Sequence, residues 1–150
     1  MGDEMGKFDF DIPKDLTKML SRMEQYDEIA PSVLNAASPI VEKAVKRGYQ
    51  RHKRTGNLER SVKTKKPSKN SMGWMTVVRP TGKSDSYMGD DGVIRTRKEP
   101  VRNMEIAAYH EYGTRKMAAS PVIGPAVQET RGEVEKKMQE IYETMIKRGG

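Results

Sequence analysis

Residues 104–126 of the chain read MEIAAYHEYGTRKMAASPVIGPA and are its most informative stretch. From Met104 to Tyr112 the residues can be divided between the two faces of a β-strand. Gly113 follows, where a backbone with a positive φ angle is plausible. Pro121 and Pro125 then lead toward a helix, and Pro125 suits the first turn of that helix. The stretch therefore predicts a strand, a loop of small residues and a C-terminal helix.

Hydrophobic periodicity predicts the helices. Apolar residues recur at helical spacing over residues 14–25 and again over residues 32–51. Pro39 is expected to kink the second helix, or to mark its true start with Ser38 as the cap. The last helix carries one apolar stripe of Val127, Val134, Met138, Ile141 and Met145.

Composition and turn residues predict the strands. Residues 58–66 and 74–78 favour strands that pair as a hairpin across residues 67–72. Residues 80–103 are a long polar segment with several glycines and prolines, and we expect a loop that is functional or disordered.

These elements predict an α+β domain. We expect a small antiparallel sheet of about three to four strands, with two N-terminal helices and one C-terminal helix packed on it. A length of 150 residues favours a single domain spanning residues 1–150. Within it, residues 1–13 are expected to form a flexible N-terminal arm.

The composition excludes several classes of protein. Hydrophobic residues make up 35% of the chain and charged residues 33%, so either part of it is mobile or another subunit completes its surface. The chain has no cysteine, which excludes disulfides and cysteine-based metal sites or nucleophiles. No run of about 18 apolar residues predicts a membrane span. Acidic residues near the N-terminus argue against a signal peptide, so we expect a soluble intracellular chain.

The net charge of +7 is concentrated in one block. Only one acid, Glu59, lies among its basic residues, which are Lys43, Lys46, Arg47, Arg51, Lys53, Arg54, Arg60, Lys63, Lys65, Lys66 and Lys69. Such a block is typical of a solvated face, of one half of a contact between subunits, or of a nucleic-acid footprint. Nucleic-acid-binding modules usually add stacking aromatics, and this block has only Tyr49.

No pattern points to catalysis, a cofactor or a metal. His52 and His110 are too distant in sequence to suggest a ligand pair, and no local cluster has metal-ligand spacing. The acidic segment 89–92 does not fit a phosphate loop. His110 and Glu111, as neighbours on a strand, would point to opposite faces, which favours a core or interface histidine over an acid–base pair.

A second motif, TGNLERS at residues 55–61, separates the long helix from the first strand. Gly56 and Asn57 favour a turn, Leu58 is its apolar anchor, and Ser61 is placed to satisfy a nearby backbone group. Alone, this motif is typical of an ordinary helix-to-strand turn.

Together, the two motifs resemble the gp-ten-like proteins of long-tailed bacteriophages. The resemblance covers residues 31–150 and is carried by Thr55, Gly56, Leu58, Ser61, Tyr109, Glu111, Tyr112, Gly113, Thr114, Pro121, Pro125 and Ala126. The chain departs from the family pattern before the last helix, where Ser120 and Gly124 stand in place of arginines and Val122-Ile123 in place of Phe-Leu.

The resemblance implies a structural role in head–tail joining or tail completion, without enzymatic activity or a cofactor. Its members are small α+β subunits that form a ring at the phage neck. The implied partners are further copies of the chain and neighbouring head-connector or tail-tube proteins, in the virion and in the host cytoplasm during assembly. DNA passes nearby without specific binding, no membrane is involved, and the basic block would serve subunit contacts.

Two alternatives remain open from the residues. One is a small basic nucleic-acid-binding protein, which rests on the basic block. The other is a small nuclease that would use Tyr109, His110 and Glu111.

Overall fold

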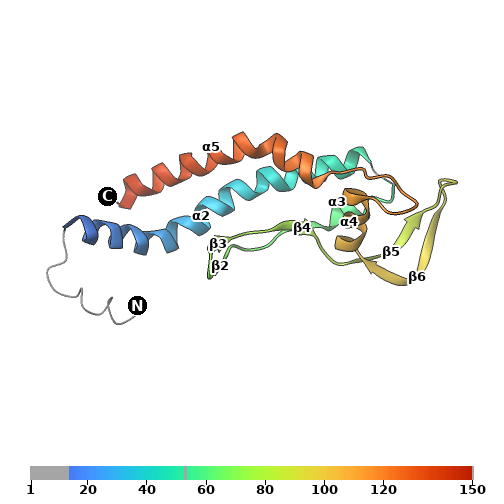
Figure 1. Cartoon of the computed structure of the whole chain (residues 1–150), viewed down its shortest axis with the longest axis horizontal. Coiled ribbons are helices and arrows are strands. Elements are labelled where there is room, and N and C mark those ends of the chain that lie inside the picture. Colours follow the sequence, from blue (N-terminus) through green and yellow to red (C-terminus); the bar gives the residue numbers. More distant parts are fainter. Residues whose placement is uncertain (1–13, 53, 150) are drawn as a thin grey trace.

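The computed structural model describes the backbone of residues 14–52 and 54–149 and the side chains of residues 25–52 and 54–148. Its elements are α2 (Lys14–Arg51), α3 (Asn57–Ser61), β1 (Val62–Thr64), β2 (Ser68–Asn70), β3 (Gly73–Met75), β4 (Val78–Pro80), β5 (Lys83–Met88), β6 (Ile94–Arg102), α4 (Asn103–Tyr112) and α5 (Ile123–Gly149). In an elongated molecule, α2 and α5 run side by side, with the strands and short helices below them and at one end (Figure 1). The predicted α+β class is confirmed. The predicted arm of residues 1–13 lies outside the described residues.

Residues 14–51 form one helix, so the expected break between residues 25 and 32 is wrong. α2 continues for 38 residues through Pro31 and Pro39. Each proline removes a backbone hydrogen bond and disfavours the helix by about 3 kcal/mol. Ala37 and Ala44, on either side of Pro39, are nevertheless both buried. Because α2 packs on α5 over a long interface, burial of one continuous face offsets the loss at the prolines.

The two long helices approach closely near the C-terminal end of α2. A Cβ atom on Gly48 would lie 2.5 Å from Cγ1 of Val122, the residue just before α5. Val122 is itself only 5% exposed. Glycine at position 48 therefore sets the distance between α2 and the start of α5.

The predicted hairpin is confirmed, with an interruption. β2 pairs with β3 next to the turn, where Lys69 faces Trp74. β1 pairs with β4 farther along, where Lys63 faces Arg79. The start of the expected first strand is wrong, because residues 57–61 form the short helix α3.

Residues 80–103 are not a long loop, and that prediction is wrong. They contain β5 and β6, an antiparallel pair with an irregularity between Ser84 and Ser86. The turn closes through a hydrogen bond from the Gly89 N–H to the Val93 oxygen, at 2.9 Å. Most side chains on both strands are polar or charged and exposed. Because the hairpin buries little apolar surface, its composition resembles that of a loop.

Residues 104–112 form a helix, so the predicted strand is wrong. α4 runs from Asn103 to Tyr112 and buries Asn103 and Ala107. Alanine, glutamate and methionine, which dominate this segment, favour helix over strand. Short apolar patterns do not distinguish the two by periodicity alone. The strands therefore form three two-stranded sheets instead of one sheet of three to four strands.

The core lies where α2, β1, α4 and the start of α5 meet. Its buried residues are Ala44, Val45, Tyr49, Val62, Ala107, Val122 and Ala126. The predicted last helix is confirmed as α5, with Pro125 in its first turn. In the described part of the chain, no helix is both long enough and apolar enough to cross a membrane.

Candidate functional site

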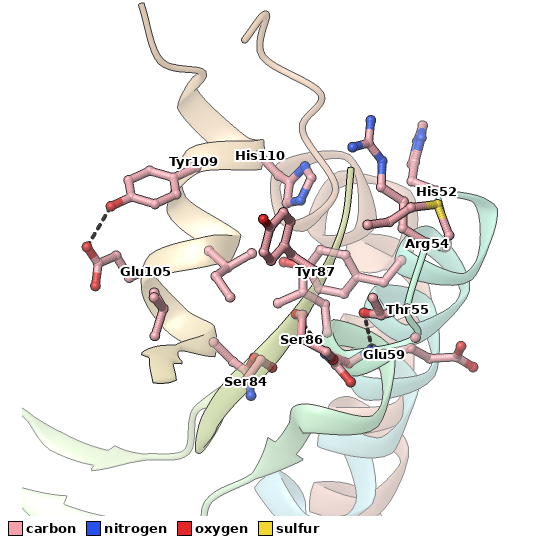
Figure 2. Close-up of a pocket in the computed structure, with 18 of the residues that line it drawn as sticks. His52, Arg54, Thr55, Glu59, Ser84, Ser86, Tyr87, Glu105, Tyr109 and His110 are labelled. Carbon is pink, nitrogen blue, oxygen red and sulfur yellow. Dashed lines mark hydrogen bonds between the residues drawn. The ribbon is translucent and has the colours of Figure 1, made fainter. Parts of the chain in front are cut away.

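A cavity of about 400 Å³ lies at the end of the molecule that holds α3 and α4. Figure 2 shows Glu105, Tyr109 and His110 of α4 on one side, and His52 and Arg54 on the other. Between them the wall is formed by α3 and the β5–β6 hairpin. The cavity thus brings together segments that lie about fifty residues apart in sequence, including parts of both sequence motifs.

The first motif forms the turn into α3 and one wall of the cavity. Gly56 has φ of 79°, a left-handed conformation that favours glycine. The Thr55 hydroxyl accepts a hydrogen bond from the Asn57 N–H at 3.2 Å. Ser61 donates its hydroxyl to the Leu58 carbonyl at 2.7 Å, as predicted for a residue that satisfies a nearby backbone group. Thr55, Gly56 and Leu58 line the cavity, whereas buried Ser61 lies outside its lining.

Two amide side chains, those of Asn57 and Asn103, hold the hairpin against the helices. Asn57 donates to the Ser86 hydroxyl at 2.8 Å, which joins α3 to β5. Asn103, only 4% exposed, accepts a hydrogen bond from the Ser84 hydroxyl and donates to the Thr81 carbonyl at 2.8 Å. These bonds fix the position of the hairpin wall. The sequence marked Asn57 only as a turn residue, and nothing marked Asn103, because residues 80–103 were expected to form a loop.

In the second motif, Glu111 connects α4 to α5. Its carboxylate accepts hydrogen bonds from the N–H groups of Val122 (2.9 Å), Ile123 (2.9 Å) and Gly124 (3.0 Å). The first N–H groups of a helix have no partner within the helix, and a carboxylate there also complements the helix dipole. Partial burial raises the pKa of Glu111, but the three N–H groups hold it below its ordinary value overall. Glu111 is therefore a structural cap in this chain.

Gly113 makes the sharp turn that lets Glu111 reach α5. Its φ is 77°, as the sequence suggested, although it ends a helix and not a strand. A Cβ atom at this position would lie 2.9 Å from the Ala119 nitrogen. Thr114 then accepts hydrogen bonds from the N–H groups of Lys116 and Met117 at 3.3 and 3.1 Å. This part of the motif is a compact turn built mainly from backbone contacts.

His110 lines the cavity, next to Glu111 in sequence but in a different environment. Burial lowers the pKa of His110, and the nearby positive charges of Arg54 and His52 lower it further. The Glu111 carboxylate accepts hydrogen bonds from the backbone at the start of α5, so His110 and Glu111 do not form an acid–base pair. Tyr109 donates its hydroxyl to Glu105 at 2.6 Å, and Tyr112 is 82% exposed.

Two cavity-lining groups have hydrogen-bonding atoms without a partner among the described residues. The Tyr49 hydroxyl is one, on a side chain that is 5% exposed. Burial raises the pKa of Tyr49 to about 12, and the negative charge of Glu111 adds to the effect. The second is Nε of Arg97, whose guanidinium lies over the Tyr87 ring at 4.9 Å from its centre. Arg97 was missed because it lies in the segment read as a loop.

The basic block is mostly solvent-exposed. Within the described residues, two of its members have a carboxylate within 4.0 Å: Lys46 pairs with Glu42 and Lys69 with Asp27. Exposed members include Lys43, Arg47, Arg51, Arg54, Arg60, Lys63, Lys65 and Lys66, while Lys53 lies outside the described residues. Of these, Arg54 contributes to the cavity wall.

The donor groups do not suit a metal ion. In the described part of the chain, no three His, Asp or Glu side chains converge as ligands. The cavity instead combines cationic side chains, unpaired polar atoms and apolar walls from residues such as Leu58, Val101 and Ile106. Such a lining fits the recognition of an anionic group joined to an apolar one. Comparison of the chain with models of protein families, with curated proteins and with solved structures gave no match.

Proposed function

We propose that this chain is a non-enzymatic structural subunit of the neck of a tailed phage, which acts in head–tail joining or tail completion. In this role, copies of the chain form a ring and contact a neighbouring head-connector or tail-tube protein. The main support for the proposal is that the two sequence motifs, residues 55–61 and 104–126, lie next to each other in the folded chain. Thr55–Leu58 and His110 line one cavity, and Glu111 directs α5 away from it.

Exposed apolar side chains at the two hairpin turns support a role in assembly. Met72, at the turn between β2 and β3, is 95% exposed. Val93 and Ile94, at the turn between β5 and β6, are 50% and 58% exposed. Single exposed apolar residues are common on protein surfaces, and those at the hairpin turns are accessible to a partner. A ring neighbour or a second neck protein would be that partner.

The charge distribution supports a head-to-tail contact between copies. α2 exposes basic side chains, including Lys43, Arg47 and Arg51. α5 exposes the acids Glu129, Glu133, Glu135, Glu140 and Glu143, together with the basic side chains of Arg131, Lys136, Lys147 and Arg148. Opposite charges on different faces of one subunit favour a heterologous interface, which closes into a ring when the rotation between neighbours permits.

Measurement of mass in solution tests the proposal. The purified chain should form a defined oligomer by light scattering, alone or after addition of tail-tube or head-connector protein. Reversal of charge at Arg47 and Arg51 to glutamate should weaken that oligomer, whereas reversal at the exposed Lys65 and Lys66, after β1, is a control with the same change in net charge. A strict monomer that binds neither class of virion protein would contradict the proposal.

Nucleic-acid binding is the second candidate, because several exposed basic side chains have no carboxylate partner in the described residues. This alternative predicts that the isolated subunit binds DNA or RNA with a steep dependence on salt. Charge reversal at Arg51, Lys53 and Arg54 separates the two candidates. If it abolished DNA binding and left the oligomer intact, nucleic-acid binding would be the better account.

A further inference from the structure

The cavity has unused hydrogen-bonding capacity. The Tyr49 hydroxyl and Nε of Arg97 are buried and have no partner among the described residues. A buried polar group left unpaired typically costs about 1–3 kcal/mol. Both side chains line the same cavity of about 400 Å³. A ligand that placed hydrogen-bond acceptor atoms in the cavity would remove this cost, so binding of such a ligand is favoured.

The lining indicates a carboxylate attached to an apolar group. The Arg97 guanidinium lies over the Tyr87 ring, 4.9 Å from its centre, and guanidinium groups match carboxylates in geometry. Arg54 adds positive charge at the opposite wall, beside His52. Two acids also line the cavity, but Glu105 already accepts a hydrogen bond from Tyr109. The other, Glu59, lies in α3.

The chain itself contains a segment with this chemistry. Residues 1–13 read MGDEMGKFDFDIP, with four acids against one lysine, a net charge of −3 in a chain of +7. Both phenylalanines of the chain, Phe8 and Phe10, lie there and alternate with Asp9 and Asp11. This segment therefore offers carboxylates directly beside large apolar side chains.

The segment cannot reach the cavity of its own chain. It joins α2 at Lys14, and Tyr49 lies 35 residues farther along the same helix, about 52 Å at the rise of an α-helix. Thirteen fully extended residues span about 45 Å. Figure 1 places the start of α2 at the opposite end of the molecule from α3 and α4. Only a second copy could supply the segment.

We propose that the cavity receives the acidic, phenylalanine-bearing segment 1–13 of a neighbouring copy of this chain, an inference that rests on the ring assembly proposed above. Arg97 and Tyr49 donate to carboxylates of the segment, and Leu58, Val101 and Ile106 contact a phenylalanine ring. Each subunit would then hold the next at a distance set by the length of α2. The contact is heterologous, as a ring requires.

The first test uses a synthetic peptide with the sequence of residues 1–13, titrated into the dilute full-length chain by calorimetry. Arg97→Gln should weaken peptide binding about tenfold or more, because a hydrogen bond to a charged partner is lost. Arg95→Gln is the matched control, since Arg95 lies on the same strand and pairs with Asp91 at 2.6 Å. Equal affinities of these two variants, or no binding of the peptide at millimolar concentration, would overturn the inference.

Tyr49→Phe separates binding from folding. It deletes only the unpaired hydroxyl, so the folded chain should be at least as stable as the wild type while the peptide binds more weakly. A peptide with both Asp9 and Asp11 changed to asparagine should also bind more weakly to the wild-type chain. Unchanged affinity in both experiments would exclude a carboxylate contact in the cavity.

Complementation tests the contact between copies. A full-length chain with Asp9→Asn and Asp11→Asn keeps an intact cavity, and a chain with Arg97→Gln keeps an intact segment. Each variant alone should form less oligomer than the wild type. An equimolar mixture should form pairs that contain one chain of each variant. If both variants assembled like the wild type, the inference would fail and the neck proposal would stand. If the peptide bound through Arg97 but the chain formed no ring and bound no virion protein, the neck proposal would fail instead.

Discussion

The two ends of the α2–α5 helix pair differ in chemistry. At one end, the cavity beside α3 and α4 is bounded by cationic side chains and by Tyr49 and Arg97, whose buried polar atoms are unpaired. At the other end, an apolar groove of about 310 Å³ lies between α2, α5 and the β2–β3 hairpin. Its lining includes Ile29, Ala30, Val33, Leu34, Trp74, Met138, Tyr142 and Ile146.

The difference lies in what holds each end together. The polar end is positioned by directed hydrogen bonds, such as those of Glu111 to α5 and of Asn57 to Ser86. At the apolar end, Asp27 supplies two such bonds by accepting from Lys69 and Trp74 at 2.9 Å each, and the remaining contacts around the groove come mainly from apolar side chains. Hydrogen bonds specify geometry, whereas apolar burial has no preferred direction. We therefore expect changes at the polar end to have the larger and more local effects.

Glu111→Ala should have the largest effect. It leaves three N–H groups at the start of α5 without their acceptor, and we expect a loss of about 2 kcal/mol in the free energy of unfolding. Urea unfolding followed by circular dichroism measures it. Glu105→Ala, on the same helix, is the control, because Glu105 bonds only the exposed Tyr109 hydroxyl among the described residues and should cost little. Equal losses for the two variants would contradict the capping role.

The same cap should be sensitive to acid. Because the folded-state pKa of Glu111 lies below its ordinary value of 4.5, its stabilising contribution is fully present above pH 4.5. The contribution is lost as the pH falls through the lower folded-state pKa. Unfolding experiments at pH 7 and below pH 4.5 should therefore show a smaller difference between wild type and Glu111→Ala in acid. A difference that grew in acid would mean that the protonated carboxyl is the better cap.

Two glycine substitutions should act in opposite directions. Gly48→Ala places a methyl group against buried Val122. The steric cost should exceed the gain in helix propensity and leave the fold less stable by about 1 kcal/mol. Gly132→Ala, in α5, meets no atom within 4 Å and should stabilise by about 0.5–1 kcal/mol. Thermal unfolding of both variants checks the signs. Stabilisation by Gly48→Ala would show that α2 and α5 can separate there without cost.

The sequence predicted the C-terminal helix better than the short elements, whereas the expected packing of the helices on one sheet is replaced by packing of α2 on α5. The last helix with Pro125 in its first turn, the helical periodicity of residues 32–51 and the first hairpin agree with the structure. These features follow from helical periodicity, or from turn residues next to β-branched and aromatic ones. These local patterns favour the same elements that the tertiary contacts stabilise, so the elements can be predicted without knowledge of the fold.

The candidate site was only partly predictable, because tertiary contacts form it. The sequence indicated the positions of Gly56, Gly113 and Ser61, since turn geometry is local. It misassigned residues 104–112, where helix and strand patterns are both plausible over so short a length. Arg97 could not be singled out either, because its role depends on stacking over Tyr87 and on a cavity wall supplied by distant residues.

At the apolar end, Asp27→Ala should loosen the hairpin without unfolding the helix pair. Trp74 and Lys69 would both lose their acceptor, so the Trp74 indole should become more exposed. A red shift of its fluorescence, with unchanged helical circular dichroism, is the expected result. Asp91→Ala, which breaks an ion pair on the other hairpin, is the control and should leave the fluorescence unchanged. If Asp27→Ala left the spectrum unchanged, apolar contacts alone would hold Trp74.

The smallest effect concerns the charge of His110 at the polar end. Burial, Arg54 and His52 together lower its pKa below 6.5, so the unfolded chain takes up a proton first and stability falls as the pH drops below 6.5. Arg54→Gln removes one of the two positive neighbours and should raise the pKa of His110 towards its ordinary value. Proton NMR of the imidazole during a pH titration measures the change. Arg51→Gln, an exposed change on α2, is the control for net charge. Because Trp74 lies at the opposite end of the helix pair, its fluorescence should not respond, and a response would show that the two ends are coupled through α2 and α5.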